Sequence, residues 1–214
     1  MYTPSAFGES DPAVHASLIR EHPLATVITV GGAAPDAFHL PLVLNREAGP
    51  LGVLEGHLPR ANPVSQQAAG GIAALAVFQG PQGYISPAWY PGKRAHGRVV
   101  PTWNYAVVHV RGVLRTIDDP AWVRAQLDAL TRQQEADAAE PWQVSDAPAP
   151  FTDRQLEALV GLELRIESSV GKWKMSQNRS AADQQGVIDG LEARGDSTSL
   201  ELAGLVARRS GQRS

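Results

Sequence analysis

Cysteine is absent from this chain of 214 residues. Without it the protein can form neither disulfides nor thiolate metal sites. A surplus of positive charge is also missing, because 19 Lys and Arg face 22 Asp and Glu, whereas dedicated DNA-binding domains are usually basic. No window approaches the roughly 18 apolar residues of a membrane span, and the start "MYTPSAFGES" lacks the regions of a secretion signal. We therefore expect a cytoplasmic protein without a membrane partner.

Several common catalytic signatures are missing as well. The six histidines show neither the HxH nor the HExxH spacing, so no metal site is expected. The chain contains no GxSxG nucleophile elbow and no glycine fingerprint of a dinucleotide-binding domain. The sequence therefore names no catalytic residue.

Short extended segments dominate what is present. Apolar and β-branched runs bounded by turn residues predict strands over 24–30, 37–44, 50–57, 72–80, 98–117 and 162–167. Pro101 within the long fifth segment implies a bulge or an edge position. Because the links are short, we expect a mainly β fold with peripheral helices, in the form of a small closed or split β-barrel.

Capping signals place the helices. Pro12 opens a helix that ends before Pro23, Asn62 caps a short helix, and Asp119 caps a longer one. Thr152 and Gln155 predict a capping box at the start of another helix. Further helices are expected over 180–191 and 200–207.

The first segment with chemical potential is "EGHLPRANP", residues 55–63. Arg60 has the planar fork that suits a phosphate, and Asn62 stands at a helix start with free amide donors. The alternative is a surface turn with a capping Asn62 and a solvated Arg60.

The second segment, residues 83–105, places aromatic side chains beside cations. Such a mixture suits a flat anionic ring system or the bases of single-stranded nucleic acid. A subunit interface explains the aromatic residues equally well, and the two interpretations are compatible.

The third segment is "GKWKMSQNRS", residues 171–180, which holds three cations, two amides and no carboxylate. An excess of donors favours an anion, and amides suit a heterocycle with carbonyl and N–H edges. A solvated basic loop would explain the lysines, but it leaves Trp173 and the amide pair without a role.

Six motifs in order resemble the FMN-binding negative transcriptional regulator family, the PaiB-like proteins. They are "MYTPSAF", "HLPLVL", "GHLPRANP", "YISPAWY", "VVPTWNY" and "GKWKMSQNR". The resemblance spans residues 1 to about 191. It implies the flavin split barrel shared with pyridoxamine-phosphate oxidases, in a homodimer that holds FMN between its subunits. On this basis we expect an FMN-binding domain over 1–192 and a polar linker with a short helix over 193–214.

The resemblance also suggests which residues bind the cofactor. The "GHLPRANP" turn is similar to the place where split barrels hold the FMN phosphate, "PTWNY" is expected at the phosphate or the ring, and the late segment is expected near the flavin. The resulting candidates are His57, Arg60, Asn62, Thr102, Trp103, Asn104, Lys174, Gln177 and Arg179.

Three functions remain open at this stage. The resemblance favours a homodimeric regulator that senses flavin or redox state, and it alone suggests DNA as a partner. The exposed candidates for DNA are the cations of residues 93–98 and the tail around Arg208 and Arg209, because no basic recognition helix is evident. The alternative is a flavin-dependent oxidoreductase acting on a small molecule, in which the flavin performs the chemistry. A barrel without cofactor, serving as an oligomeric scaffold, is a third possibility.

Overall fold

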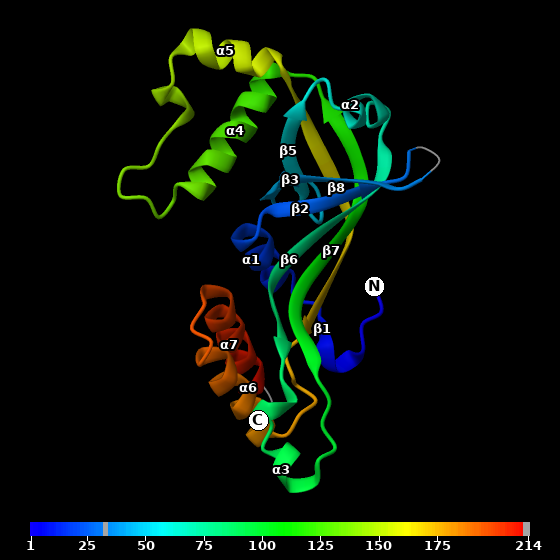
Figure 1. The fold of residues 1–214 in the computed structure, drawn as a ribbon. Helices are drawn as coiled ribbons and strands as arrows, with labels where there is room; N and C mark the ends of the chain where they lie inside the picture. Colours follow the sequence, from blue (N-terminus) through cyan, green and yellow to red (C-terminus); the bar gives the residue numbers. More distant parts are fainter. Residues whose placement is uncertain (32–33, 212–214) are drawn as a thin grey trace. The chain divides into compact units, whose positions relative to one another are not determined.

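A mainly antiparallel β-sheet with accompanying helices makes up the computed structural model, which describes residues 1–31 and 34–211 (Figure 1). Over these residues the sheet has eight strands; seven follow the order β3-β2-β6-β7-β8-β5-β4, and β1 pairs with β8. The strands are β1 (Gly8–Glu9), β2 (Leu24–Thr29), β3 (Asp36–Pro41), β4 (Val43–Asn45), β5 (Val53–Pro59), β6 (Ile72–Ile85), β7 (Thr102–Ile117) and β8 (Leu159–Lys174). The expectation of a mainly β fold is confirmed.

The helices of the described residues are mostly short. They are α1 (Pro12–Glu21), α2 (Pro63–Gln67), α3 (Gly92–His96), α4 (Pro120–Gln134), α5 (Ala149–Glu157), α6 (Ala181–Glu192) and α7 (Ser197–Ser210), with 3₁₀ turns η1 (Ser5–Phe7), η2 (Pro87–Trp89) and η3 (Val144–Asp146). None of the helices in this part of the chain has the length and apolar character needed to cross a bilayer.

The chain divides into two compact units. Unit 1 comprises Met1–Asp11, Gln79–Val108 and Val170–Ser214, and unit 2 comprises Pro12–Phe78 and His109–Ser169. Strands β6, β7 and β8 each contribute residues to both units. The candidate residues therefore fall into two groups: His57, Arg60 and Asn62 belong to unit 2, and the other six belong to unit 1.

Several strands differ in extent from the sequence-based prediction. The segment expected as one strand over 37–44 forms two strands, β3 and β4, and the strand expected over 50–57 lies at Val53–Pro59. Strand β6 continues through Pro81 to Ile85, although Gly80 and Pro81 were expected to end it. Strand β7 begins at Thr102, so Pro101 precedes the strand rather than lying within it as a bulge. Strand β8 extends to Lys174 and pairs there with β1, with Gly8 opposite Lys172. This pairing joins segments more than 160 positions apart in the chain, so no local sequence pattern predicts it.

The helix starts are largely as predicted. Asn62 caps α2 by accepting from the Val64 amide, and Asp119 caps α4 by accepting from the amides of Ala121 and Trp122. The capping box at Thr152 is wrong, because α5 begins at Ala149 and Thr152 lies inside it. A Pro at the second helical position opens this helix instead, a place where its missing N–H costs nothing.

Helices α6 and α7 lie side by side in unit 1 (Figure 1). Their apolar faces are fully buried at Val187, Leu191, Leu202 and Val206. Burial of such side chains stabilises each by about 1.5–3 kcal/mol relative to exposure. The helix expected over 200–207 is thus longer than predicted and packs on α6. A domain boundary after residue 192 remains a prediction, and residues 212–214 lie outside the described residues.

Candidate functional site

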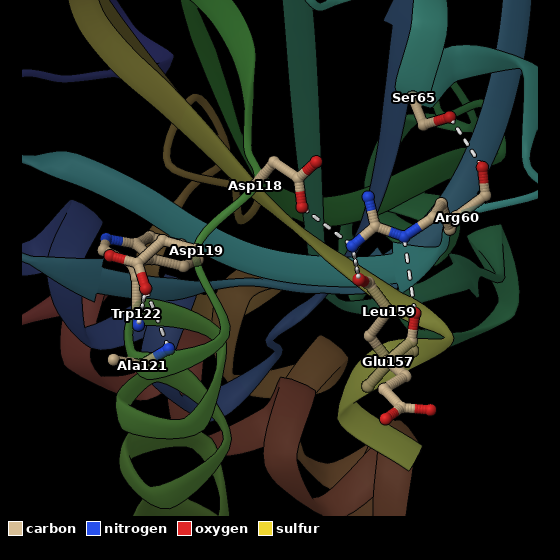
Figure 2. A network of polar contacts seen from close by, with 8 residues as sticks. All are labelled: Arg60, Ser65, Asp118, Asp119, Ala121, Trp122, Glu157 and Leu159. Atoms are coloured by element: carbon tan, nitrogen blue, oxygen red, sulfur yellow. Dashed lines mark hydrogen bonds and ion pairs between the residues drawn. The ribbon is translucent and has the colours of Figure 1, made fainter. Parts of the chain in front are cut away.

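The Arg60 guanidinium is engaged within unit 2. Figure 2 shows it between Asp118, which it meets at 2.8 Å, and the backbone carbonyls of Glu157 and Leu159, at 3.4 and 3.0 Å. Its own carbonyl accepts from the Ser65 hydroxyl. The hydrogen bond and charge of Arg60 lower the pKa of Asp118 below its usual value. Arg60 thus connects the β5–α2 turn to the start of β8 and to the segment before α4. Most N–H donors of its guanidinium are engaged in these bonds.

The other two candidates of this turn also have partners. The Asn62 side chain accepts from the Val64 amide as the cap of α2. His57 Nδ1 lies 2.8 Å from Oε1 of Gln126, a residue of α4 that is only 1% exposed. The capping role of Asn62 is therefore confirmed, whereas Arg60 is paired with Asp118 and not merely solvated. A role of this turn in cofactor binding stays a prediction.

Unit 1 contains a different arrangement, which we call the basic cluster: Lys172, Lys174 and Arg179. Side chains of a strand alternate between its two faces. Lys172 and Lys174 consequently share one face of β8, while Trp173, 3% exposed, is buried on the other. Arg179 follows after a tight turn, just before α6.

Lys174 is the most constrained member of the cluster. Its ammonium donates to the Thr102 hydroxyl at the start of β7. Burial lowers the pKa of Lys174, the neighbouring charges of Lys172 and Arg179 lower it further, and Tyr105 partly opposes them. A nearby anion would stabilise the protonated form of such a lysine and would offset the cost of its partial desolvation.

Aromatic rings accompany the other two cations. The Lys172 ammonium lies 5.5 Å from the centre of the Tyr105 ring, and the Arg179 guanidinium lies 4.9 Å from that of Tyr90. Each contact is worth about 0.5–1 kcal/mol at an exposed site. Lys172 also donates to the backbone carbonyl of Tyr2 at 3.2 Å. The rings hold the cations in place without neutralising them.

No carboxylate within residues 1–31 and 34–211 forms an ion pair with the basic cluster. The nearest acid in sequence, Asp183, accepts instead from the Gly92 amide at 3.0 Å. Two ammonium groups, one guanidinium and one hydroxyl thus offer many donors and no negative charge. This donor set fits the phosphate of the flavin mononucleotide that the family resemblance implies.

Buried amides fix the turn that carries Arg179. Ser176 has a left-handed backbone, with φ of 60°. Its hydroxyl exchanges hydrogen bonds with the fully buried Asn104, at 2.9 and 3.3 Å. Gln177 folds back to accept from the Met175 amide, and Gln184 of α6 donates to the carbonyl of Arg179 at 3.0 Å. Asn104 and Gln177, predicted as flavin contacts, therefore fix the turn that carries Arg179, Asn104 through the Ser176 hydroxyl and Gln177 through the backbone. A contact of their own with flavin stays a prediction.

Trp103 is the exposed aromatic residue of the predicted set, with 48% of its surface accessible. Its indole N–H donates to Gln82, and its ring meets Tyr84 edge to face at a centroid distance of 6.2 Å. This pair lies on β6 and β7, where both rings remain open to a ligand or a second subunit.

The structure thus brings together Thr102, Asn104, Lys174, Gln177 and Arg179 in unit 1. Sequence reasoning missed several residues that support the two groups: Asp118, Gln126, Ser176 and Gln184. Their roles depend on contacts between distant segments. Only the position of Ser176 next to two amides hinted at a polar turn.

Comparisons with known proteins identify the family of the chain. A protein-family model described as "Putative FMN-binding domain" matches residues 1–168. The "Uncharacterized protein AN0679" of Emericella nidulans is 32% identical, over 98% of this chain and 97% of its own. The "Protease synthase and sporulation protein PAI 2" of Bacillus subtilis is 27% identical, over 96% of each chain.

Solved structures show the same fold. The FAD and heme binding protein of Mycobacterium smegmatis superposes with a TM-score of 0.60 at 21% identity, over 78% of this chain and 72% of its own. The flavocytochrome Anf3 of Azotobacter vinelandii gives 0.58 at 15% identity, over 78% and 69%. The likeness establishes the split-barrel fold expected from the sequence. Since the family model covers well over half of the chain, the protein belongs to the FMN-binding domain family, and the resemblance to PaiB-like proteins is confirmed.

Proposed function

We propose that the protein binds FMN and that the basic cluster, with the Thr102 hydroxyl, holds the cofactor's phosphate. The observation that carries this proposal is the absence of an acidic partner for Lys172, Lys174 and Arg179 in the described chain. A hydrogen bond to a charged group contributes about 1.5–3 kcal/mol. Three or four such bonds, with contacts to the ring, suffice for micromolar binding. Bound flavin supplies the redox chemistry, and the protein supplies its placement.

A homodimeric regulator that responds to flavin or its redox state is the function we favour. The membership of the family that includes PAI 2 supports a role of this type. The exposed Trp103 and Tyr84 suit a subunit contact, since aromatic residues are enriched at interfaces. For DNA, the exposed cations Lys93, Arg94 and Arg98 are better candidates than Arg209, which is paired with Glu9 and mostly buried.

The phosphate assignment is tested by comparing FMN with riboflavin, which lacks only the phosphate. In flavin fluorescence titrations, Lys174→Ala is expected to weaken FMN binding by about ten- to hundredfold, which corresponds to the loss of about one charge-assisted hydrogen bond. Riboflavin binding should be nearly unchanged. Lys93→Ala removes an exposed charge of α3 and serves as the control. Equal losses for both ligands, or no loss for FMN, would contradict the assignment.

The regulator is distinguished from an oxidoreductase by two measurements on the FMN-loaded protein. Specific, salt-dependent binding to duplex DNA favours the regulator. Rapid bleaching of the flavin by NAD(P)H, with recovery in air, favours the enzyme. A protein that gains no yellow colour with added FMN would contradict both.

A further inference from the structure

A histidine in unit 2 is held by one buried side chain. Gln126 of α4 places Oε1 2.8 Å from His57 Nδ1, and its Nε2 lies 3.4 Å from the backbone carbonyl of Glu55. Gln126 is 1% exposed, while His57 is half-buried on β5. Helix α4 packs on β5, so both contacts come from one helix lying on one strand face (Figure 1).

The direction of these hydrogen bonds follows from which groups can donate and which can only accept. A backbone carbonyl can only accept, so the amide nitrogen of Gln126 must face Glu55. Its oxygen therefore faces His57, and an oxygen can only accept. Consequently His57 carries a hydrogen on Nδ1. In the neutral ring the lone pair is then on Nε2.

Nothing in the described chain occupies that lone pair. Within the described residues His57 forms a hydrogen bond through Nδ1 alone, and its Nε2 is not buried without a partner, whereas Nδ1 of His109 is. The acids nearest on this face are engaged elsewhere: Glu55 accepts from Asn45, and Glu163, its partner across β8, pairs with Arg115. Nε2 of His57 is therefore accessible and forms no hydrogen bond with a neighbouring side chain among the described residues.

We propose that His57 Nε2 is an acceptor site for a neutral ligand group that bears O–H or N–H, and that Gln126 is the positioning residue that fixes this tautomer. In the neutral ring Nε2 carries no hydrogen, so this form accepts from a ligand and does not donate to one. This goes beyond the FMN proposal, which rests on the basic cluster, and it holds whether or not FMN binds there.

Nitrogen NMR of the His57 ring in mildly alkaline buffer tests the tautomer on the full chain. We expect the hydrogen on Nδ1 in the native protein and in Gln126→Glu, which keeps an acceptor. Gln126→Met removes the acceptor at similar volume, and the hydrogen should move mainly to Nε2, the form that free imidazole side chains prefer. Gln133→Met, on the same helix, loses a bond to the Arg20 carbonyl and should leave His57 unchanged.

Two results would overturn the proposal. One is a native His57 with its hydrogen on Nε2; the other is a folded Gln126→Met variant that keeps it on Nδ1. If Gln126→Met does not fold, the native protein and Gln126→Glu still decide. Accessibility is tested with diethyl pyrocarbonate, which acylates an unprotonated imidazole nitrogen. Mass spectrometry should find His57 modified alongside the exposed His39, and an unmodified His57 would refute the site.

Discussion

Lys174, the last residue of β8, donates a hydrogen bond to the hydroxyl of Thr102, the first residue of β7. The contact joins two strand ends that lie 72 positions apart in the chain. It also holds an ammonium group in a partly buried place that has no carboxylate partner among the described residues. A lysine held in this way is prepared for an anionic ligand before the ligand arrives, which reduces the entropy that binding must overcome.

The lowered pKa of Lys174 predicts a pH-dependent affinity for FMN. Burial is the main cause, and Lys172 and Arg179 add to it. Only the protonated lysine attracts phosphate, so FMN affinity should fall as the pH rises through this pKa, below the range of an ordinary lysine. Lys174→Arg keeps its charge there and should flatten the profile. Titrations across the alkaline range measure this, and parallel profiles for the two proteins would refute the role of Lys174.

A second prediction concerns Glu9 of β1 and Arg209 of α7, whose side chains pair at 10% and 19% exposure. Burial acts to raise the pKa of Glu9, but hydrogen bonds from the Asp11 amide and Arg209, with the charge of Arg209, bring it below the usual value. The pair thus stabilises the fold at neutral pH, and this contribution is lost as the pH falls through the lowered pKa of Glu9. Arg209→Met should cost about 1–3 kcal/mol of unfolding free energy at neutral pH.

The control for this pair is the neighbouring Arg208→Met, which removes an exposed cation. Urea denaturation at neutral and acidic pH should show that Arg209→Met loses less stability on acidification than the native protein does. A constant difference between the two proteins at all pH values would show that Arg209 acts through its packing on Trp173, 5.5 Å from the ring centre.

A third prediction separates structure from binding at Arg60. Because its donors serve Asp118 and two backbone carbonyls, Arg60→Ala should lower the melting temperature by no more than a few degrees, as expected for an exposed pair. Asp118→Asn should do the same, and the double variant should lose less than the sum. FMN titrations of the three variants then test the predicted role of Arg60 in cofactor binding. A selective loss of FMN binding in Arg60→Ala would support that role, and unchanged affinity in all three variants would limit Arg60 to the structural contacts described above.

The local features of this fold were accessible from the sequence. Asn62 and Asp119 cap helices as their residue type and the following Pro indicate, and the alternation at Leu162 and Leu164 correctly placed a half-buried strand. Each of these features depends on residues within one turn or one strand. The family motifs supplied the split barrel, which periodicity alone left open as a closed or split barrel.

The site was less accessible, because its contacts join distant segments. The residue types around Arg60 suit a phosphate, yet Asp118 lies 58 positions away and uses the same fork. Likewise, the side-chain amide of Gln177 is of a type that binds ligands, but its oxygen accepts from the backbone N–H of Met175, two residues earlier. Residue type reveals what a side chain can bind, whereas the competing partner is known only once the strands are paired.

The last prediction concerns the contact of Trp89 with α6. Gly186 and Gly190 form one face of this helix, and Trp89 lies directly on it: a β-carbon on Gly190 would come within 2.2 Å of the indole ring, and one on Gly186 within 2.1 Å of the Trp89 carbonyl oxygen. Arg194 covers the ring, 4.6 Å from its centre. Gly190→Ala should therefore destabilise the protein by about 1–3 kcal/mol through overpacking, although alanine is the better helix former by about 1 kcal/mol.

Gly204→Ala in α7 provides the matched control for that substitution. A β-carbon there would meet only the end of the Arg208 side chain, at 3.4 Å, which is free to move. This variant gains the helix propensity of alanine without a clash, so its unfolding free energy should rise by up to about 1 kcal/mol. Urea denaturation of both variants, with Trp fluorescence as the signal, gives the comparison. If Gly190→Ala were as stable as Gly204→Ala, the indole would not rest on α6, and the close packing that positions Trp89 and its neighbour Tyr90 beneath Arg179 would be refuted.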